Sequence, residues 1–153
     1  MDEHNYIRIL REELRPAMGC TEPIAIAYAA AKARDVLGAM PDRLLAEVSG
    51  NIVKNVKSVV IPHTGGLRGI PAAVAAGCAA GDAEAELSVL SYVTPAQAAQ
   101  IAAYLERTPI EVRCVENAHI FDIRITAFRG DDSAYVRICL LYTSPSPRDQ
   151  RGS

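Results

Sequence analysis

The chain has 153 residues, of which 50% are hydrophobic and 22% are charged, and its formal net charge is -2. This length is enough for one domain with a real core, and the charge gives no strong preference for nucleic acid or an anionic membrane. The apolar stretches 24–31 and 70–80 are shorter than the roughly 20 residues of a spanning helix, and the acidic start is not a secretory signal. We therefore expect a cytoplasmic protein without nucleic-acid or membrane partners.

The first part of the chain is predicted to be helical. Over residues 3–14, apolar side chains recur at helical spacing, which predicts an amphipathic helix that Pro16 ends. An alanine-rich helix is expected to follow, because Thr21 is a good N-cap, Pro23 suits a first turn and no breaker occurs before Gly38. Small side chains let another backbone approach closely, so this helix is expected to be central and tightly packed.

Cys20 lies at the entrance of this alanine-rich helix. The unpaired N–H groups and the dipole of a helix N-terminus favour negative charge, so the thiolate form becomes more accessible there. Such a cysteine could be a base, a nucleophile or a metal ligand. The structural alternative is a small residue packed in a bend, since free cysteine is commonly buried and inert.

The other cysteines give no sign of a metal site. The four cysteines, Cys20, Cys78, Cys114 and Cys139, are widely separated along the sequence, and no CxxC pair occurs. This spacing indicates neither a zinc site nor a redox motif, so no metal ligand is predicted and free thiols are expected. Cys78 and Cys114 are interpreted as packed core residues.

The segment 44–62 is rich in valine and isoleucine and has Ser49-Gly50-Asn51 in its middle, which predicts two or three short strands broken at the glycine. Asn51, Lys54 and Asn55 bring polar groups into this segment. Lysine suits the carboxylate of an amino acid, and asparagine amides suit its carboxylate or its amine. The alternative is an ordinary solvated strand face.

A glycine-rich loop, 63–71, is predicted to connect a strand to a helix that runs from about Pro71 to Ala80. Exposed backbone N–H groups at such a junction could hold a substrate carboxylate. The loop is neither a Walker A motif nor a GxGxxG fingerprint. Most glycine-rich connections are merely turns, and that reading stays open here. The candidate ligand groups in the loop are Thr64, Gly65, Gly66 and Gly69.

The last part of the chain changes from helical to strand periodicity. Helices are expected over 83–92 and after Thr94, whose side chain would cap a helix with Pro95 in its first turn. Apolar and polar residues then alternate with a period of two over residues 110–114, 121–125 and 134–138. This pattern predicts a three-stranded antiparallel meander with one solvated face. The expected fold class is α+β, with alanine-rich helices packed against short strands.

Two sequence blocks resemble a known family. The first is Arg15-Pro-Ala-Met-Gly-Cys-Thr-Glu-Pro-Ile-Ala-Ile-Ala, and the second combines Val48-Ser-Gly-Asn-Ile-Val-Lys-Asn-Val with Val60-Ile-Pro-His-Thr-Gly-Gly-Leu-Arg-Gly-Ile-Pro-Ala-Ala. In this order they resemble the L-cysteine desulfidase family, relatives of the iron-sulfur L-serine dehydratase alpha chain. The resemblance reaches to about Arg137. His63 departs from it, because close members often have glycine there.

The resemblance implies a lyase that eliminates hydrogen sulfide from L-cysteine to give pyruvate and ammonia, using a 4Fe-4S cluster held by three cysteines. It gives Cys20 the position of the proposed proton acceptor, although a ligand role competes. The candidates for contacts with the amino-acid substrate are Asn51, Lys54, Asn55, Thr64, Gly65, Gly66 and Gly69. L-serine dehydratase and a non-catalytic amino-acid-binding module are the alternative functions. Assembly into a homo-oligomer is a further expectation that the sequence leaves open.

Residues 139–153 resemble a translated transposase adaptor from sequencing-library preparation, with a genuine Ser/Pro tail as the alternative. We therefore expect residues 1–138 to be the N-terminal part of a longer enzyme and the tail to be non-native. On this interpretation the cluster ligands lie beyond the chain, and the chain alone is inactive.

Overall fold

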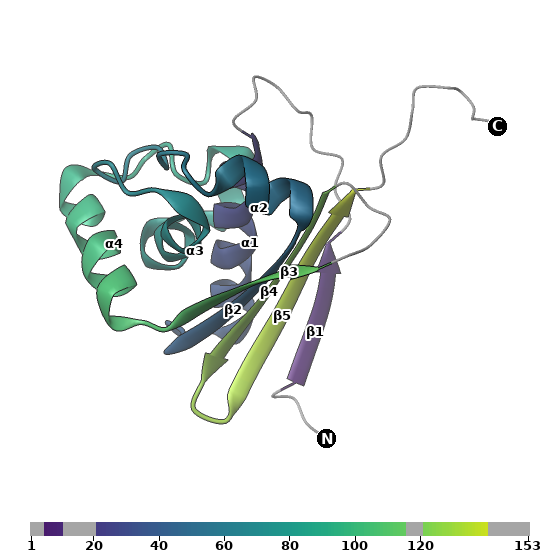
Figure 1. Ribbon diagram of the computed structural model, residues 1–153. Coiled ribbons are helices and arrows are strands. Elements are labelled where there is room, and N and C mark those ends of the chain that lie inside the picture. The colour runs from purple at the N-terminus through teal and green to yellow at the C-terminus, as the bar shows by residue number, and fades with distance from the viewer. Residues whose placement is uncertain (1–4, 11–20, 116–120, 141–153) are drawn as a thin grey trace.

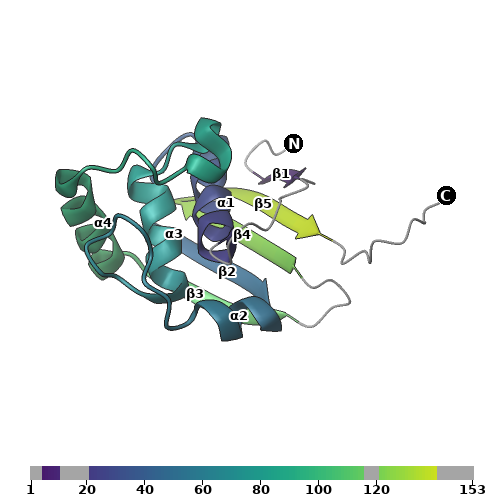
Figure 2. The ribbon, with the colours of Figure 1, turned by 90° about the horizontal axis from the view of Figure 1, so that it is seen from above.

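The computed structural model describes residues 5–10, 21–115 and 121–140 (Figure 1). The elements are β1 (Asn5–Leu10), α1 (Thr21–Leu37), β2 (Arg43–Ser49), α2 (Gly50–Val56), α3 (Gly69–Ala80), the 3-10 helix η1 (Ala83–Ser88), α4 (Pro95–Arg107), β3 (Ile110–Val115), β4 (Phe121–Arg129) and β5 (Asp132–Leu140). The helices lie on one face of a five-stranded sheet (Figures 1 and 2). The α+β class expected from the sequence is confirmed.

The sheet has the strand order β1-β5-β4-β2-β3. β4 runs antiparallel to both β5 and β2, whereas β1 pairs parallel to β5 and β3 pairs parallel to β2. The antiparallel β4–β5 pair agrees with the predicted meander, but β3 does not lie next to β4. β2 occupies that place, with Val48 opposite Ile123. A period of two identifies strands but does not say which strands pair, so the sequence could not order them.

The helix predicted over residues 3–14 is wrong, since residues 5–10 form strand β1. A short apolar segment fits both periodicities, and Ile7 and Ile9 are β-branched residues that favour a strand. The backbone of this segment pairs with the edge of β5 over its whole length. The choice between helix and strand for residues 5–10 therefore depends on pairing with β5, a segment distant in sequence.

The strands predicted after Gly50 are also wrong. β2 ends at Ser49, and the next residues form helix α2. Ile52 and Val56 are the buried residues of α2, and they lie four positions apart, which is the spacing of one helical face. The helix expected over 83–92 is shorter and takes the 3-10 form, as η1.

The core between α1 and α3 is made mainly of alanine. The residues of α1 from Ala25 to Ala31 are almost completely buried, as are Ala72, Ala73 and Ala75 of α3. At the crossing, a Cβ atom added to Gly77 would overlap the backbone carbonyl of Ala27. The two helices are thus in backbone contact, as the alanine content predicted.

The predicted helix ends are confirmed at two places. α1 begins at Thr21 and is followed by Gly38, whose φ of +82° suits glycine. α4 has a complete capping box, in which the Thr94 side chain accepts from the Gln97 backbone and the Gln97 side chain accepts from the Thr94 backbone. Within the described ranges, no helix has both the length and the apolar character needed to cross a membrane.

Candidate functional site

The first turn of α1 lies against α2. The Nδ2 atom of Asn55 donates a hydrogen bond of 3.2 Å to Oε2 of Glu22, across a sequence separation of 33 residues. Because α1 begins at Thr21, Cys20 directly precedes the helix, as the sequence predicted. Cys20 itself lies outside the described residues. The segment that follows the cysteine and the polar segment around Asn55 are thus neighbours in the fold.

α2 carries the three predicted polar residues on its solvent side. Asn51, Lys54 and Asn55 are all exposed, while Ile52 and Val56 face the core. Residues three and four positions apart share one face of a helix, so Lys54 and Asn55 lie one turn on from Asn51. The result is a short polar surface of one ammonium and two amides, next to the Glu22 carboxylate.

The glycine-rich loop is closed by its own threonine. Thr64 is buried, and its hydroxyl donates to the carbonyl of Ile61 at 2.7 Å and accepts from the N–H of Leu67 at 3.1 Å. Both contacts lie inside the loop, so the Thr64 hydroxyl holds the turn together. A substrate contact by this side chain remains a prediction that this geometry does not favour.

The three candidate glycines of the loop have different surroundings. Gly65, Gly66 and Gly69 all adopt positive φ, as does His63 at 63°. Gly65 and Gly66 are exposed, whereas Gly69 is buried and its N–H donates to the carbonyl of Val59 at 3.1 Å. The Gly69 amide is therefore already paired, whereas Gly65 and Gly66 are exposed.

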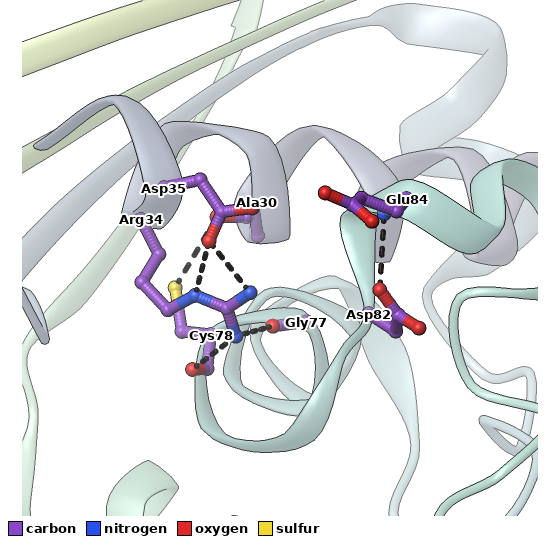
Figure 3. Close-up of polar contacts among 7 residues, drawn as sticks. All are labelled: Ala30, Arg34, Asp35, Gly77, Cys78, Asp82 and Glu84. Carbon is purple, nitrogen blue, oxygen red and sulfur yellow. Dashed lines mark hydrogen bonds and ion pairs between the residues drawn. The ribbon is translucent and has the colours of Figure 1, made fainter. Parts of the chain in front are cut away.

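Cys78 is a core residue, as predicted. It is fully buried in α3, and its Sγ donates to the carbonyl of Ala30 at 3.7 Å (Figure 3). Burial raises the pKa of the Cys78 thiol to about 12, and the nearby positive charge of Arg34 offsets only part of that rise. This thiol stays protonated at neutral pH and is suited to packing rather than to chemistry.

Cys114 is exposed, so its predicted core position is wrong. It lies on β3, an edge strand, and its Sγ is 3.6 Å from the point that a Cβ of Gly50 would occupy. Because Gly50 has no side chain, this end of β3 is left open at the start of α2. The alternating pattern of β3 places Cys114 on the side of buried Val48, as predicted, but it could not show that this position is exposed.

Two side chains near this surface were missed at the sequence level. Glu22 is not among the candidate residues of the sequence analysis, although an acidic residue in a first turn brings a carboxylate to the start of the helix. Cys114 was assigned to the core. Among the described residues, no three His, Cys, Asp or Glu side chains gather in a way that could hold a metal ion.

The fold and the polar surface define a helix-covered α+β domain with a small, mixed-charge site at the α1–α2 contact. Three relatives are each named UPF0597 protein, from Desulfitobacterium hafniense, Treponema denticola and Shewanella baltica. They are 55%, 42% and 43% identical to this chain over 90%, 91% and 88% of its length. The chain spans only 32%, 32% and 31% of these relatives. No family model and no solved structure matches it.

The expected membership of the L-cysteine desulfidase family is wrong. Relatives at 42–55% identity match across most of this chain, and the name they carry is UPF0597 protein. The two blocks cover the start of α1, the end of β2, all of α2 and the start of α3, which is a smaller part of the chain than the relatives match. The similarity that the whole chain supports is to the UPF0597 proteins.

Proposed function

We propose that this chain provides a binding site for a small L-amino acid, within an enzyme that removes the β-substituent of L-cysteine or L-serine. The observation that carries the proposal is the hydrogen bond between Asn55 and Glu22. This hydrogen bond holds the polar face of α2 beside the first turn of α1, and Cys20 directly precedes α1 in the sequence. The proposal also places the protein in the cytoplasm, where an exposed thiol such as that of Cys114 stays reduced.

The groups at this surface match the charges of a zwitterionic amino acid. The ammonium of Lys54 would bind the substrate carboxylate, with an amide of Asn51 beside it. The carboxylate of Glu22, held by Asn55, would accept from the substrate amine. Each contact pairs an ionised group with a partner of opposite charge or with an amide, which is the stronger class of hydrogen bond.

Cys20 is the proposed proton acceptor. Its thiolate would take the proton from Cα while the bond from Cβ to sulfur breaks, releasing HS⁻ and leaving 2-aminoacrylate, which water converts to pyruvate and ammonia. From L-serine the leaving group would be hydroxide. The described residues offer no ligand set for the 4Fe-4S cluster. The proposal therefore assigns this chain substrate binding and proton transfer only.

Calorimetric titration of the chain with L-cysteine and L-serine tests the binding step. Lys54→Ala should weaken binding at least about fivefold, since it removes a charge-assisted contact of roughly 1 kcal/mol or more. Asn55→Ala should also weaken binding, because it removes the hydrogen bond that holds the Glu22 carboxylate. Lys57→Ala is the matched control, because Lys57 is exposed next to the same helix, and its affinity should not change. Equal affinities for the Lys54 and Lys57 variants would contradict the site.

Turnover is tested separately in a full-length protein that carries this segment. Pyruvate should form from the substrate, and Cys20→Ala should abolish its formation while L-cysteine binding is kept. A full-length protein that binds the amino acid tightly and releases no pyruvate would support a non-catalytic binding module and would end the lyase proposal.

A further inference from the structure

The sheet has a second face that no helix of the described residues covers (Figures 1 and 2). The side chains that point toward the helices are almost completely buried, and they include Leu44, Ala46, Val48, Ile123, Ile125, Val136 and Ile138. Because side chains alternate along a strand, the residues between them point to the opposite side. We call that side the open face.

The open face carries an ordered row of charges across four strands. Arg113 of β3 is opposite Glu47 of β2, Glu47 is opposite Arg124 of β4, and Arg124 is opposite Arg137 of β5. The next row reads Glu111, Leu45, Thr126 and Tyr135 in the same strand order. The face thus combines fixed charges with half-buried larger side chains.

An aspartate holds the two arginines of the row in place. Asp122 is fully buried, and its carboxylate accepts from Arg124 at 3.0 Å and from two nitrogens of Arg137 at 3.1 and 3.0 Å. About a quarter of each arginine side chain stays exposed. The Nε atom of Arg124 is buried without an acceptor among the described residues. Glu47, opposite Arg124, supplies a second negative charge, so the two arginines and the two carboxylates balance. The Nε–H of Arg124 is a donor that the described residues leave unused.

We propose that the open face is the docking surface for the remainder of the full-length protein, the part of the UPF0597 relatives that lies outside this chain. About two thirds of each relative lies outside the matched segment, so ample chain exists to cover the face. The unused Nε–H of Arg124 and the exposed quarter of each arginine fit carbonyl or carboxylate oxygens in that remainder.

A second copy of this chain fits the open face less well. A two-fold contact centred on the cluster would bring the Arg124–Arg137 pairs of both copies together, which like-charge repulsion disfavours. The proposal does not depend on the amino-acid site, which lies at the α1–α2 contact on the helical side of the sheet.

Thiol alkylation of a full-length chimera tests the proposal. In the chimera, residues 1–138 of this chain replace the matching segment of the Desulfitobacterium hafniense relative. Thr126→Cys places a thiol in the middle of the open face, and Glu106→Cys, on the exposed side of α4, is the matched control. Alkylation at position 126, followed by peptide mass spectrometry, should be at least tenfold slower in the chimera than in the chain alone. The rate at position 106 should be the same in both.

Equal alkylation rates at position 126 in the two proteins would overturn the proposal. Slower alkylation at both position 126 and position 106 in the chimera would contradict a docking contact confined to the open face. Protection of position 126 in the chain alone that grows with protein concentration would identify a second copy as the occupant instead. Hydroxyl-radical oxidation of Tyr135 in the unsubstituted proteins gives the same comparison if Thr126→Cys disturbs folding.

Discussion

Arg34, in the last turn of α1, donates from Nη1 to the carbonyl oxygen of Gly77 in α3 at 3.2 Å. The same nitrogen lies 3.2 Å from the carbonyl oxygen of Cys78, and Asp35 holds the other edge of the guanidinium (Figure 3). The charge is thus placed near the C-terminal end of α3, where the helix dipole favours a cation. One side chain therefore links the ends of the two central helices.

Arg34→Met should lower the free energy of unfolding by about 1–2 kcal/mol, because it removes charged hydrogen bonds to two carbonyl oxygens but keeps the apolar stem. Urea denaturation measures the change. Asp35→Ala is the matched control: the Asp35 side chain is about half exposed, so the loss of its ion pair with Arg34 should stay within about 0.5 kcal/mol. If the two variants lose the same free energy of unfolding, the hydrogen bonds from Arg34 to the carbonyls of α3 do not stabilise the protein.

Gly77→Ala should destabilise the protein by about 3 kcal/mol or more, or prevent folding, because its Cβ would overlap the Ala27 backbone and push α1 and α3 apart. Gly50→Ala offers a matched change within a helix. There the nearest atom is the Cys114 Sγ at 3.6 Å, an ordinary contact, so stability should change little or rise slightly. Thermal denaturation of both variants checks the pair, and a tolerated Gly77→Ala would contradict the close crossing.

Asp122→Asn should cost about 2–4 kcal/mol of stability, because it leaves Arg124 and Arg137 without the buried carboxylate that both contact. The loss is below that of a fully buried pair, since each arginine is about a quarter exposed. Glu111→Gln, which breaks an exposed pair with Arg113, is the control and should change stability by less than about 1 kcal/mol. Chemical denaturation at neutral pH measures both.

Cys78 should make the protein lose stability in alkali. Its pKa is raised from 9.0 to about 12, so the folded thiol keeps its proton over a pH range in which the unfolded chain releases it. The contribution of the Cys78 thiol to the free energy of unfolding is therefore fully present below pH 9.0 and is lost as the pH rises toward about 12. Burial also raises the pKa of Tyr104, which acts in the same direction.

Cys78→Ala should flatten this alkaline loss without abolishing it, because Tyr104 remains. Denaturation midpoints measured at intervals of pH from about 8 to about 11 give the slopes. In a parallel labelling experiment at mildly alkaline pH, iodoacetamide should modify Cys114 but not Cys78 in the folded protein. An unchanged slope for Cys78→Ala would contradict a buried, protonated thiol.

Much of the helical layer could be predicted from local signals. Thr94 marks a helix start by side-chain capping, α1 begins at the expected residue, Thr21, and Gly38 marks a helix end through its positive φ. The dense alanine pattern of α1 predicted a closely packed helix. Asn51, Lys54 and Asn55 were singled out as polar residues in an apolar segment, but they were expected on strands and lie on helix α2.

The strand assignments depended on partners that the local pattern does not contain. Residues 5–10 fit a helix and a strand about equally, and pairing with β5 decides between them. β3 has the expected alternation but pairs with β2, which enters the sheet from far earlier in the chain. The exposure of Cys114 likewise depends on Gly50, a residue 64 positions away in sequence.

The sequence by itself determined the α+β class, the Thr94 cap of α4 and the small-residue packing of α1, because these depend on capping hydrogen bonds, side-chain size and periodicity within one segment. Only the tertiary structure decided the strand order, the contact between Glu22 and Asn55 and the arginine cluster around Asp122. Each of these joins segments that are distant in sequence or fixed only by sheet pairing. The free energy that selects them comes from burial and pairing of the whole fold, which no local pattern encodes.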